Sequence, residues 1–202
     1  MSANPQTYVT PVEYLTGERK REFKSEYWNG EVYAMAGASE RHNLITANVV
    51  IELGTQLRRR SCKIYPSDMR VKIPAMGLYT YPDVVVVCGK PQFEDEENDT
   101  LLNPTVIVEV LSKSTENYDR GRKFENYRRL ESLTEYLLIA QDRPYIEHYM
   151  RQADNQWLLS ETKELQDVIE LPTIECKLAL ADVYDKVDFQ SRPRVLRESD
   201  EG

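Results

Sequence analysis

Two carboxylates stand out because each lies in or beside a run of apolar residues. Asp83 follows Pro82 and leads directly into four valines, and Glu109 interrupts a second apolar run over residues 105–111. Valine-rich runs without polar alternation are typical of strands that are covered on both faces of the sheet. A carboxylate in such a strand must be paired, protonated or bound to a metal, because its uncompensated burial costs several kcal/mol or more.

The places of the two acids in their runs indicate how they could meet. Asp83 opens its strand and Glu109 lies near the end of the next strand, so an antiparallel pair would bring them together. If Asp83 lay opposite Leu111, Val85 would face Glu109, and the two acids would lie diagonally on one face. Carboxylates this close repel, so either one holds a proton or a cation lies between them. Hard oxygen ligands with open water positions favour Mg²⁺ or Mn²⁺.

The composition predicts one compact, soluble domain. The chain has 202 residues, of which 41% are hydrophobic and 30% are charged, and this is enough to bury a sizeable core. Residues 1–10 contain no basic region followed by an apolar stretch, and no apolar run approaches membrane-spanning length. We therefore expect a cytoplasmic protein with no membrane partner.

The cysteines are few and widely spaced. Cys62, Cys88 and Cys176 fit neither a disulfide framework nor a zinc pattern. We expect them to be reduced thiols that pack in the core, as in a reducing compartment.

The net charge of −8 argues at first against a nucleic-acid partner, but the charge is unevenly distributed. Residues 56–72 hold six basic residues against Asp68 alone. Binding depends on the local field, so this segment could contact phosphates through Arg58, Arg59 and Arg60. The same three arginines would also suit the solvated end of a helix, where they favour the helix dipole.

The order of helices and strands expected from the sequence predicts an α/β fold, in which helices cover the faces of a mixed sheet. Capping residues, the Asn29-Gly30 turn and the apolar periodicity define the elements. We expect a short helix that starts at about residue 11 and further helices over about 40–59, 118–130 and 180–184. The expected strands cover about 25–28, 31–35, 68–73, 83–87, 105–111, 135–140, 145–151 and 156–160. We expect a single domain over residues 1–187 and a disordered tail over 188–202.

The order of several short motifs resembles the Uma-type family of restriction-endonuclease-like proteins, within the PD-(D/E)XK nuclease superfamily. The resemblance runs from about residue 10 to residue 184, and the whole series in order is more specific than any single motif. The motifs are Glu26-Tyr27-Trp28-Asn29-Gly30-Glu31, Arg41-His42-Asn43, Ser67-Asp68-Met69-Arg70-Val71, Tyr81-Pro82-Asp83-Val84, Glu109-Val110-Leu111-Ser112, and the spacing of Asp119, Lys123 and Tyr127.

This resemblance implies a restriction-endonuclease-like fold and metal-dependent hydrolysis of phosphodiester bonds, in DNA rather than RNA. Asp83, Glu109 and the carbonyl of Val110 would hold Mg²⁺ or Mn²⁺. The superfamily places a lysine two residues after the strand glutamate, where this chain has Leu111. The family pattern assigns the role to Lys123 on the following helix, and Lys113, just beyond the strand, is the second candidate.

Further residues have weaker claims to the site. Glu26 would complete the metal shell or act as a base if its strand reached the site, and His42 and Asp68 are secondary candidates. Arg122 joins the arginines above as a candidate nucleic-acid contact. A restriction enzyme is often a dimer that matches a palindromic target, so a homodimer is an open expectation.

Three alternatives compete with the nuclease hypothesis. Asp83 could mark a proline-fixed strand start, with Glu109 in a structural ion pair with Arg122 or Lys123. Leu111 at the expected lysine position favours a non-catalytic nuclease-fold module that binds nucleic acid or a protein. A carboxylate pair could also hydrolyse glycosides, which needs no metal.

Overall fold

The computed structural model describes residues 8–113 and 115–189. Its helices are α1 (Pro11–Glu18), α2 (Glu40–Leu57), α3 (Glu116–Tyr118), α4 (Phe124–Tyr127) and α5 (Leu180–Val183), with the short helical segments η1 (Pro74–Met76), η2 (Asp119–Lys123) and η3 (Pro172–Ile174). Its strands are β1 (Ser25–Trp28), β2 (Glu31–Ala34), β3 (Cys62–Pro66), β4 (Arg70–Ile73), β5 (Leu78–Thr80), β6 (Val84–Cys88), β7 (Thr100–Leu101), β8 (Val106–Leu111), β9 (Glu135–Ala140), β10 (Ile146–Arg151), β11 (Trp157–Thr162), β12 (Val168–Leu171) and β13 (Cys176–Ala179).

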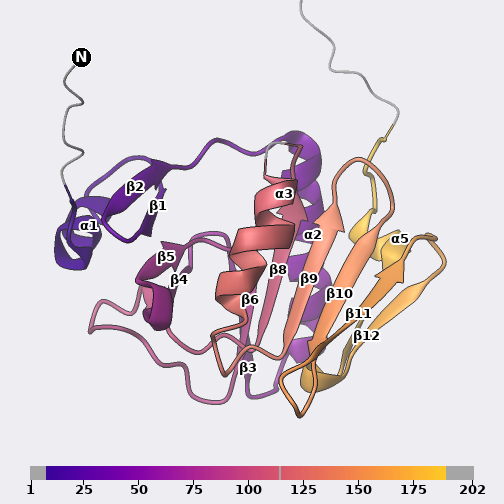
Figure 1. The fold of residues 1–202 in the computed structure, drawn as a ribbon. Coiled ribbons are helices and arrows are strands. Elements are labelled where there is room, and N and C mark those ends of the chain that lie inside the picture. Colours follow the sequence, from indigo (N-terminus) through magenta and orange to yellow (C-terminus); the bar gives the residue numbers. More distant parts are fainter. Residues whose placement is uncertain (1–7, 114, 190–202) are drawn as a thin grey trace, which may run out of the picture.

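A six-stranded sheet in the order β11-β10-β9-β8-β6-β3 forms the centre of the fold. Strands β8 and β9 are parallel, and the other neighbours in this sheet are antiparallel. Helix α2 lies behind the sheet and the α3–η2–α4 segment lies in front of it (Figure 1). The mixed sheet with helices on both faces confirms the predicted fold class.

Both sides of the central strands are buried, as their valine runs predict. The stripe Ile45, Val49, Leu53 and Leu57 of α2 packs on one face together with Val84, Val86, Val106 and Val108. On the other face, Val85, Val87 and Ile107 pack with Phe124, Tyr127 and Leu130. Since alternate residues of a strand point to opposite faces, Asp83 and Glu109 belong to the side of α4.

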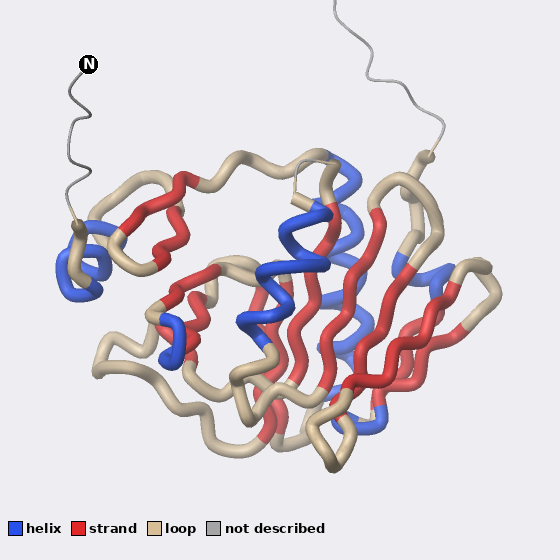
Figure 2. The backbone as a smooth tube through the Cα atoms, viewed as in Figure 1, coloured by secondary structure: helices blue, strands red, loops and turns tan. Residues whose placement is uncertain are grey.

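The second sheet, β2-β1-β5-β4-β7, begins with the hairpin predicted from Asn29-Gly30. Both turn residues have positive φ, 45° and 94°, which is the backbone that a two-residue hairpin turn requires. This smaller sheet and α1 lie to one side of the central sheet (Figure 2). Thr10 and Glu13 form the predicted capping box at the start of α1.

The structure corrects several predicted element boundaries. The strand predicted over 68–73 begins at Arg70, so Asp68 lies in the preceding turn, and the predicted helix over 118–130 is divided into α3, η2 and α4. Segment η2 is a π-helical turn. The β12–β13 hairpin and strands β3, β5 and β7 were missed, because they are short and weakly patterned. Of the tail expected to be disordered, residues 190–202 lie outside the described part of the chain.

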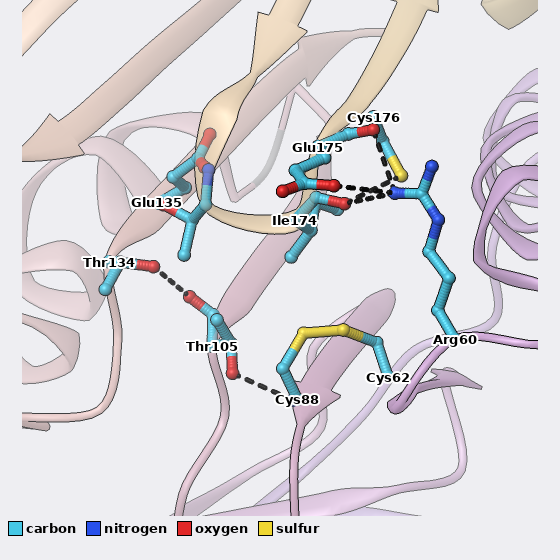
Figure 3. Close-up of a disulfide and its surroundings, with 10 residues drawn as sticks. Arg60, Cys62, Cys88, Thr105, Thr134, Glu135, Ile174, Glu175 and Cys176 are labelled. Carbon is cyan, nitrogen blue, oxygen red and sulfur yellow. Dashed lines mark hydrogen bonds and ion pairs between the residues drawn. A yellow bond between two sulfur atoms is a disulfide. The ribbon is translucent and has the colours of Figure 1, made fainter.

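The cysteine prediction is wrong in one respect. Cys62 and Cys88 form a disulfide, because the antiparallel register places them directly opposite each other on β3 and β6 (Figure 3). Nothing in their sequence separation indicates this pairing. Cys176 is a buried free thiol, as predicted.

No helix within the described ranges is long and apolar enough to cross a membrane.

A charged network ties α1 to the acidic loop between β6 and β7. Arg19 donates from Nε to Asp99 at 2.7 Å and pairs with Asp95 at 2.7 Å. Arg70, which is buried, lies 2.9 Å from the same Asp99 carboxylate. The hydrogen bond from Arg19, together with the charge of Arg70, lowers the pKa of Asp99 below its usual range.

This lowered pKa gives a pH-dependent contribution to stability. Asp99 should stabilise the fold fully above the pKa of an unfolded aspartate, about 3.9, and lose this contribution as the pH falls toward its lower folded value. The side chain is 34% exposed, so we expect Asp99→Asn to cost about 1 kcal/mol at pH 7, after allowance for solvent screening. Urea unfolding across pH checks the trend, with the exposed neighbour change Glu97→Gln as control; a cost that stays constant down to pH 2 would contradict it.

Candidate active site

The two carboxylates predicted to meet do lie on one face of an antiparallel pair. Strand β6 pairs with β8 so that Val84 faces Val108 and Val85 faces Ile107. Continued by one step, this register places Asp83 across from Glu109. The antiparallel prediction is confirmed, although the expected pairing of Asp83 with Leu111 is two residues out of register. Direct opposition brings the two acids closer than the diagonal arrangement would.

Lys123 lies at the centre of the charged groups on this face. Its Nζ lies 2.8 Å from Glu109 Oε1, 3.5 Å from Asp119 Oδ1 and 3.7 Å from Glu26 Oε1. Its side chain is only 7% exposed. The π-helical turn η2 carries both Asp119 and Lys123, and it runs directly into α4, which is docked on the sheet.

Neighbouring hydroxyl groups fix the carboxylates around Lys123. Tyr127 donates from its hydroxyl to Glu109 Oε1 at 2.9 Å, and Thr80 donates to Glu26 Oε1. Tyr136 donates to the backbone carbonyl of Asp119 at 3.2 Å. These contacts come from β5, α4 and β9, so several separate elements hold the cluster in place.

The cluster carries more negative than positive charge. Burial raises the pKa of Glu109 well above its ordinary value, the charges of Asp83 and Asp119 raise it further, and Lys123 opposes the rise. Burial also raises the pKa of Asp119. Although burial lowers the pKa of Lys123, the surrounding carboxylates outweigh this and raise it well above its usual range, so Lys123 is an ammonium group. An additional cation would relieve this excess of carboxylates.

The donor atoms beside Asp83 fit a hard divalent cation. The Val110 N–H donates to Asp83 Oδ2 at 2.7 Å. Because the N–H and C=O of one strand residue point to the same side, the Val110 carbonyl lies on the same edge of β8 as this N–H. No three side chains of His, Cys, Asp or Glu converge as a metal cluster in the parts of the chain that the structure describes. Two carboxylates and a carbonyl, with the remaining positions left to water, match the binding habits of Mg²⁺.

His42 also meets the site. Its Nε2 lies 3.2 Å from Asp83 Oδ2, at the N-terminal end of α2. Its Nδ1 is buried and has no hydrogen-bond partner within residues 8–113 and 115–189. The imidazole therefore contacts the Asp83 carboxylate through Nε2, and within the described residues its Nδ1 is left without a partner.

Other predicted residues lie away from this cluster. Asp68 is 86% exposed and pairs with Lys24 at 2.9 Å, and Lys113 is exposed. Arg58 and Arg59 are exposed at the opposite end of α2 from His42, about 24 Å away at 1.5 Å per residue. Arg60 donates to the carbonyls of Ile174 and Glu175 in the turn between β12 and β13 (Figure 3).

Four contributors to the site were not predicted as site residues: Asp119, Tyr127, Thr80 and Tyr136. The four-residue spacing of Asp119, Lys123 and Tyr127 was a usable signal, since residues four apart lie on one helix face. The sequence around Thr80 gave no such signal, because the contact of Thr80 with Glu26 depends on the pairing of β5 with β1. No ion pair joins Arg122 to Asp83 or Glu109 in the part of the chain that the structure describes, and its guanidinium carbon lies 4.2 Å from the centre of the Trp28 ring.

Replacement of Lys123 by an apolar side chain should expose how far the fold depends on this ion pair. We expect Lys123→Met to lower the free energy of unfolding by about 3–5 kcal/mol, because Glu109 would be left buried beside two other acids. Urea denaturation at pH 7 measures the loss. Addition of Glu109→Gln in the same chain should recover part of it.

Lys113→Met is the matched control, since this lysine is exposed and its replacement should change stability by no more than about 0.5 kcal/mol. Equal effects of the two lysine variants would show that Lys123 is not the buried partner described here.

Comparison with known proteins places the chain in a family. Residues 11–182 match the family model described as "Uma2: Putative restriction endonuclease". Two uncharacterized proteins of Synechocystis sp. (strain ATCC 27184 / PCC 6803 / Kazusa) are similar in sequence. One, sll1609, is 42% identical over 153 residues, covering 76% of this chain and 86% of the relative. The other, slr1290, is 34% identical over 185 residues, covering 92% and 96%.

A solved structure shares the fold. The crystal structure described as a putative nuclease belonging to DUF820 from Anabaena variabilis ATCC 29413 superposes with a TM-score of 0.70 at 18% identity, covering 87% of this chain and 97% of the other. The architecture is that of the restriction-endonuclease-like fold, and the chain belongs to the Uma2 family.

Proposed function

We propose that the protein is a nuclease that hydrolyses phosphodiester bonds in DNA with the help of Mg²⁺ or Mn²⁺. The observation that carries the proposal is the convergence of Asp83, Glu109 and Lys123 on one buried face, with the Val110 backbone alongside. Membership of the Uma2 family supports the reaction class. The preference for DNA is the part that rests most on the family.

Asp83, Glu109 and the Val110 carbonyl are the groups that would hold the metal. When bound, a divalent cation supplies a water of lowered pKa and neutralises charge on the phosphoryl oxygens. His42 positions Asp83 through the contact at 3.2 Å, and the Val110 N–H fixes one oxygen of the same carboxylate. Oriented ligands of this kind need no rearrangement before a substrate binds.

Lys123 provides the positive charge that the reaction needs at the phosphoryl group. Its ammonium lies beside Glu109, so it can orient the attacking water or stabilise the pentacovalent transition state. Glu26 and Asp119 hold the ammonium from the other side. In this arrangement Lys123 replaces the lysine that the superfamily places where this chain has the buried Leu111.

Metal binding and cleavage can be tested on the same variants. We expect wild type to bind Mg²⁺ or Mn²⁺ in calorimetry at neutral pH and to nick plasmid DNA. Asp83→Asn and Glu109→Gln should lose metal binding, and cleavage should fall by about a hundredfold or more, since each removes a proposed ligand.

Asp68→Asn is the control, because this acid is exposed and lies outside the site. It should leave both binding and cleavage unchanged. Metal binding in wild type without cleavage of DNA would point to another substrate, and no metal binding even with DNA present would favour the non-catalytic module.

A further inference from the structure

One face of the β1–β2 hairpin continues from the candidate active site to an exposed group of aromatic and charged side chains. Glu26 and Trp28 are two residues apart on β1, so they share a face and lie about 7 Å apart along the strand. Glu26 meets Lys123 at 3.7 Å, and Trp28 meets the neighbouring Arg122. The same strand face therefore contacts consecutive residues of η2.

The guanidinium of Arg122 lies over the ring of Trp28. The guanidinium carbon of Arg122 lies 4.2 Å from the centre of the Trp28 ring, the shortest such contact among the described residues. Arg122 is exposed and Trp28 is partly exposed, so the outer side of the guanidinium is open to solvent. Guanidinium planes and aromatic rings are the groups on which unpaired bases stack.

Tyr33 extends this surface from β2. It lies directly across from Glu26 in the hairpin register and is 46% exposed. Its hydroxyl donates to Glu31, which lies across from Trp28. Glu31 and Tyr33 therefore lie on the same face of the hairpin as Trp28, over which Arg122 lies. The Glu31 carboxylate raises the pKa of Tyr33, and the charge of Arg122 opposes this rise.

The balance of charge decides which part of a nucleotide this surface suits. Phosphate contacts depend on unbalanced positive charge, and here Glu31 lies across from Trp28, so it adds a negative charge to the hairpin face that Arg122 covers. Stacking depends on ring faces and tolerates a neutral surface. The surface is therefore better suited to a base than to a second phosphate.

We propose that Arg122, Trp28 and Tyr33 form a stacking site for an unpaired base next to the phosphate held at the active site, so that single-stranded DNA is the preferred substrate. The inference rests on the proposed function for the neighbouring phosphate. A duplex keeps its bases stacked on each other and cannot use this surface unless a base is flipped out. The base of the bound strand would lie on the side of the Arg122 guanidinium that faces away from Trp28.

Binding without cleavage tests the site directly. Fluorescence anisotropy in EDTA would compare a labelled short oligothymidylate with a duplex of equal length. We expect Arg122→Gln and Trp28→Leu each to weaken binding of the single strand by about 5- to 150-fold, the range measured for loss of one base stack. Duplex binding should change little.

Arg128→Gln is the matched control. This arginine is also exposed and also lies over an aromatic ring, at 5.2 Å from the centre of Phe124, and it should have no effect on binding. The chain has two tryptophans, so Trp157→Phe leaves Trp28 as the single tryptophan, which can be excited selectively over tyrosine. Its emission should change when oligothymidylate is added.

Two outcomes would overturn the inference: wild type that binds the duplex as tightly as the single strand, or Arg122→Gln with no larger effect than Arg128→Gln. Arg122 is a surface residue, so the second comparison holds even where Trp28→Leu fails to fold. Cleavage is measured separately with Mn²⁺. Stacking without cleavage would contradict the proposed function and leave only the stacking site for an unpaired base, whereas cleavage without a preference for single strands would contradict only this inference.

Discussion

The ion pair between Glu109 and Lys123 is the interaction on which the rest of the site depends. Glu109 lies in a strand that is buried on both faces, where a lone carboxylate would cost several kcal/mol. The partner comes from a different element, η2, so the sheet and the helix in front of it must dock correctly for the charge to be compensated. Tyr127 adds a hydrogen bond from α4 to the same carboxylate. The docking of η2 and α4 on the sheet during folding therefore also brings the residues of the site together.

The ion pair leaves an imbalance that a purely structural role does not explain. Three carboxylates share one ammonium within the described residues, and a fourth, Asp83, raises the pKa of Glu109. A structural ion pair would be more stable with fewer acids around it. Buried sites with an uncompensated excess of one charge are commonly functional, because the missing charge arrives with the ligand.

Much of this site could be predicted from local sequence patterns. The valine runs indicate two buried neighbouring strands, and their period of two places Asp83 and Glu109 on one face whether the register is the expected or the observed one. The capping residues and the apolar stripe define α2 within two residues at its C-terminal end. The role of Lys123 could not be derived from spacing alone, since its reach depends on how η2 is wound. The family resemblance supplied that choice.

The remaining features depend on long-range packing and were not accessible to such patterns. The Cys62–Cys88 bond follows from the β3–β6 register, and β3 itself is a short strand with little alternation. The same bond lies at the end of β6 away from Asp83, so the crosslink and the site occupy opposite ends of one strand. Thr80 reaches Glu26 only because β5 pairs with β1.

The π-helical winding of η2 fixes the number of residues in this segment more strictly than it fixes which residues they are. Gly121 has no positive φ, and a Cβ added there would meet no atom within 4 Å, so many residues could occupy the position. Removal of one residue is different. A deletion of one residue in η2 would restore α-helical winding. The residues before the deletion would then be rotated about the helix axis by about 100° relative to the docked α4. Asp119 would then be displaced relative to Lys123, so alignments of functional relatives should contain varied residues at this position and no gap.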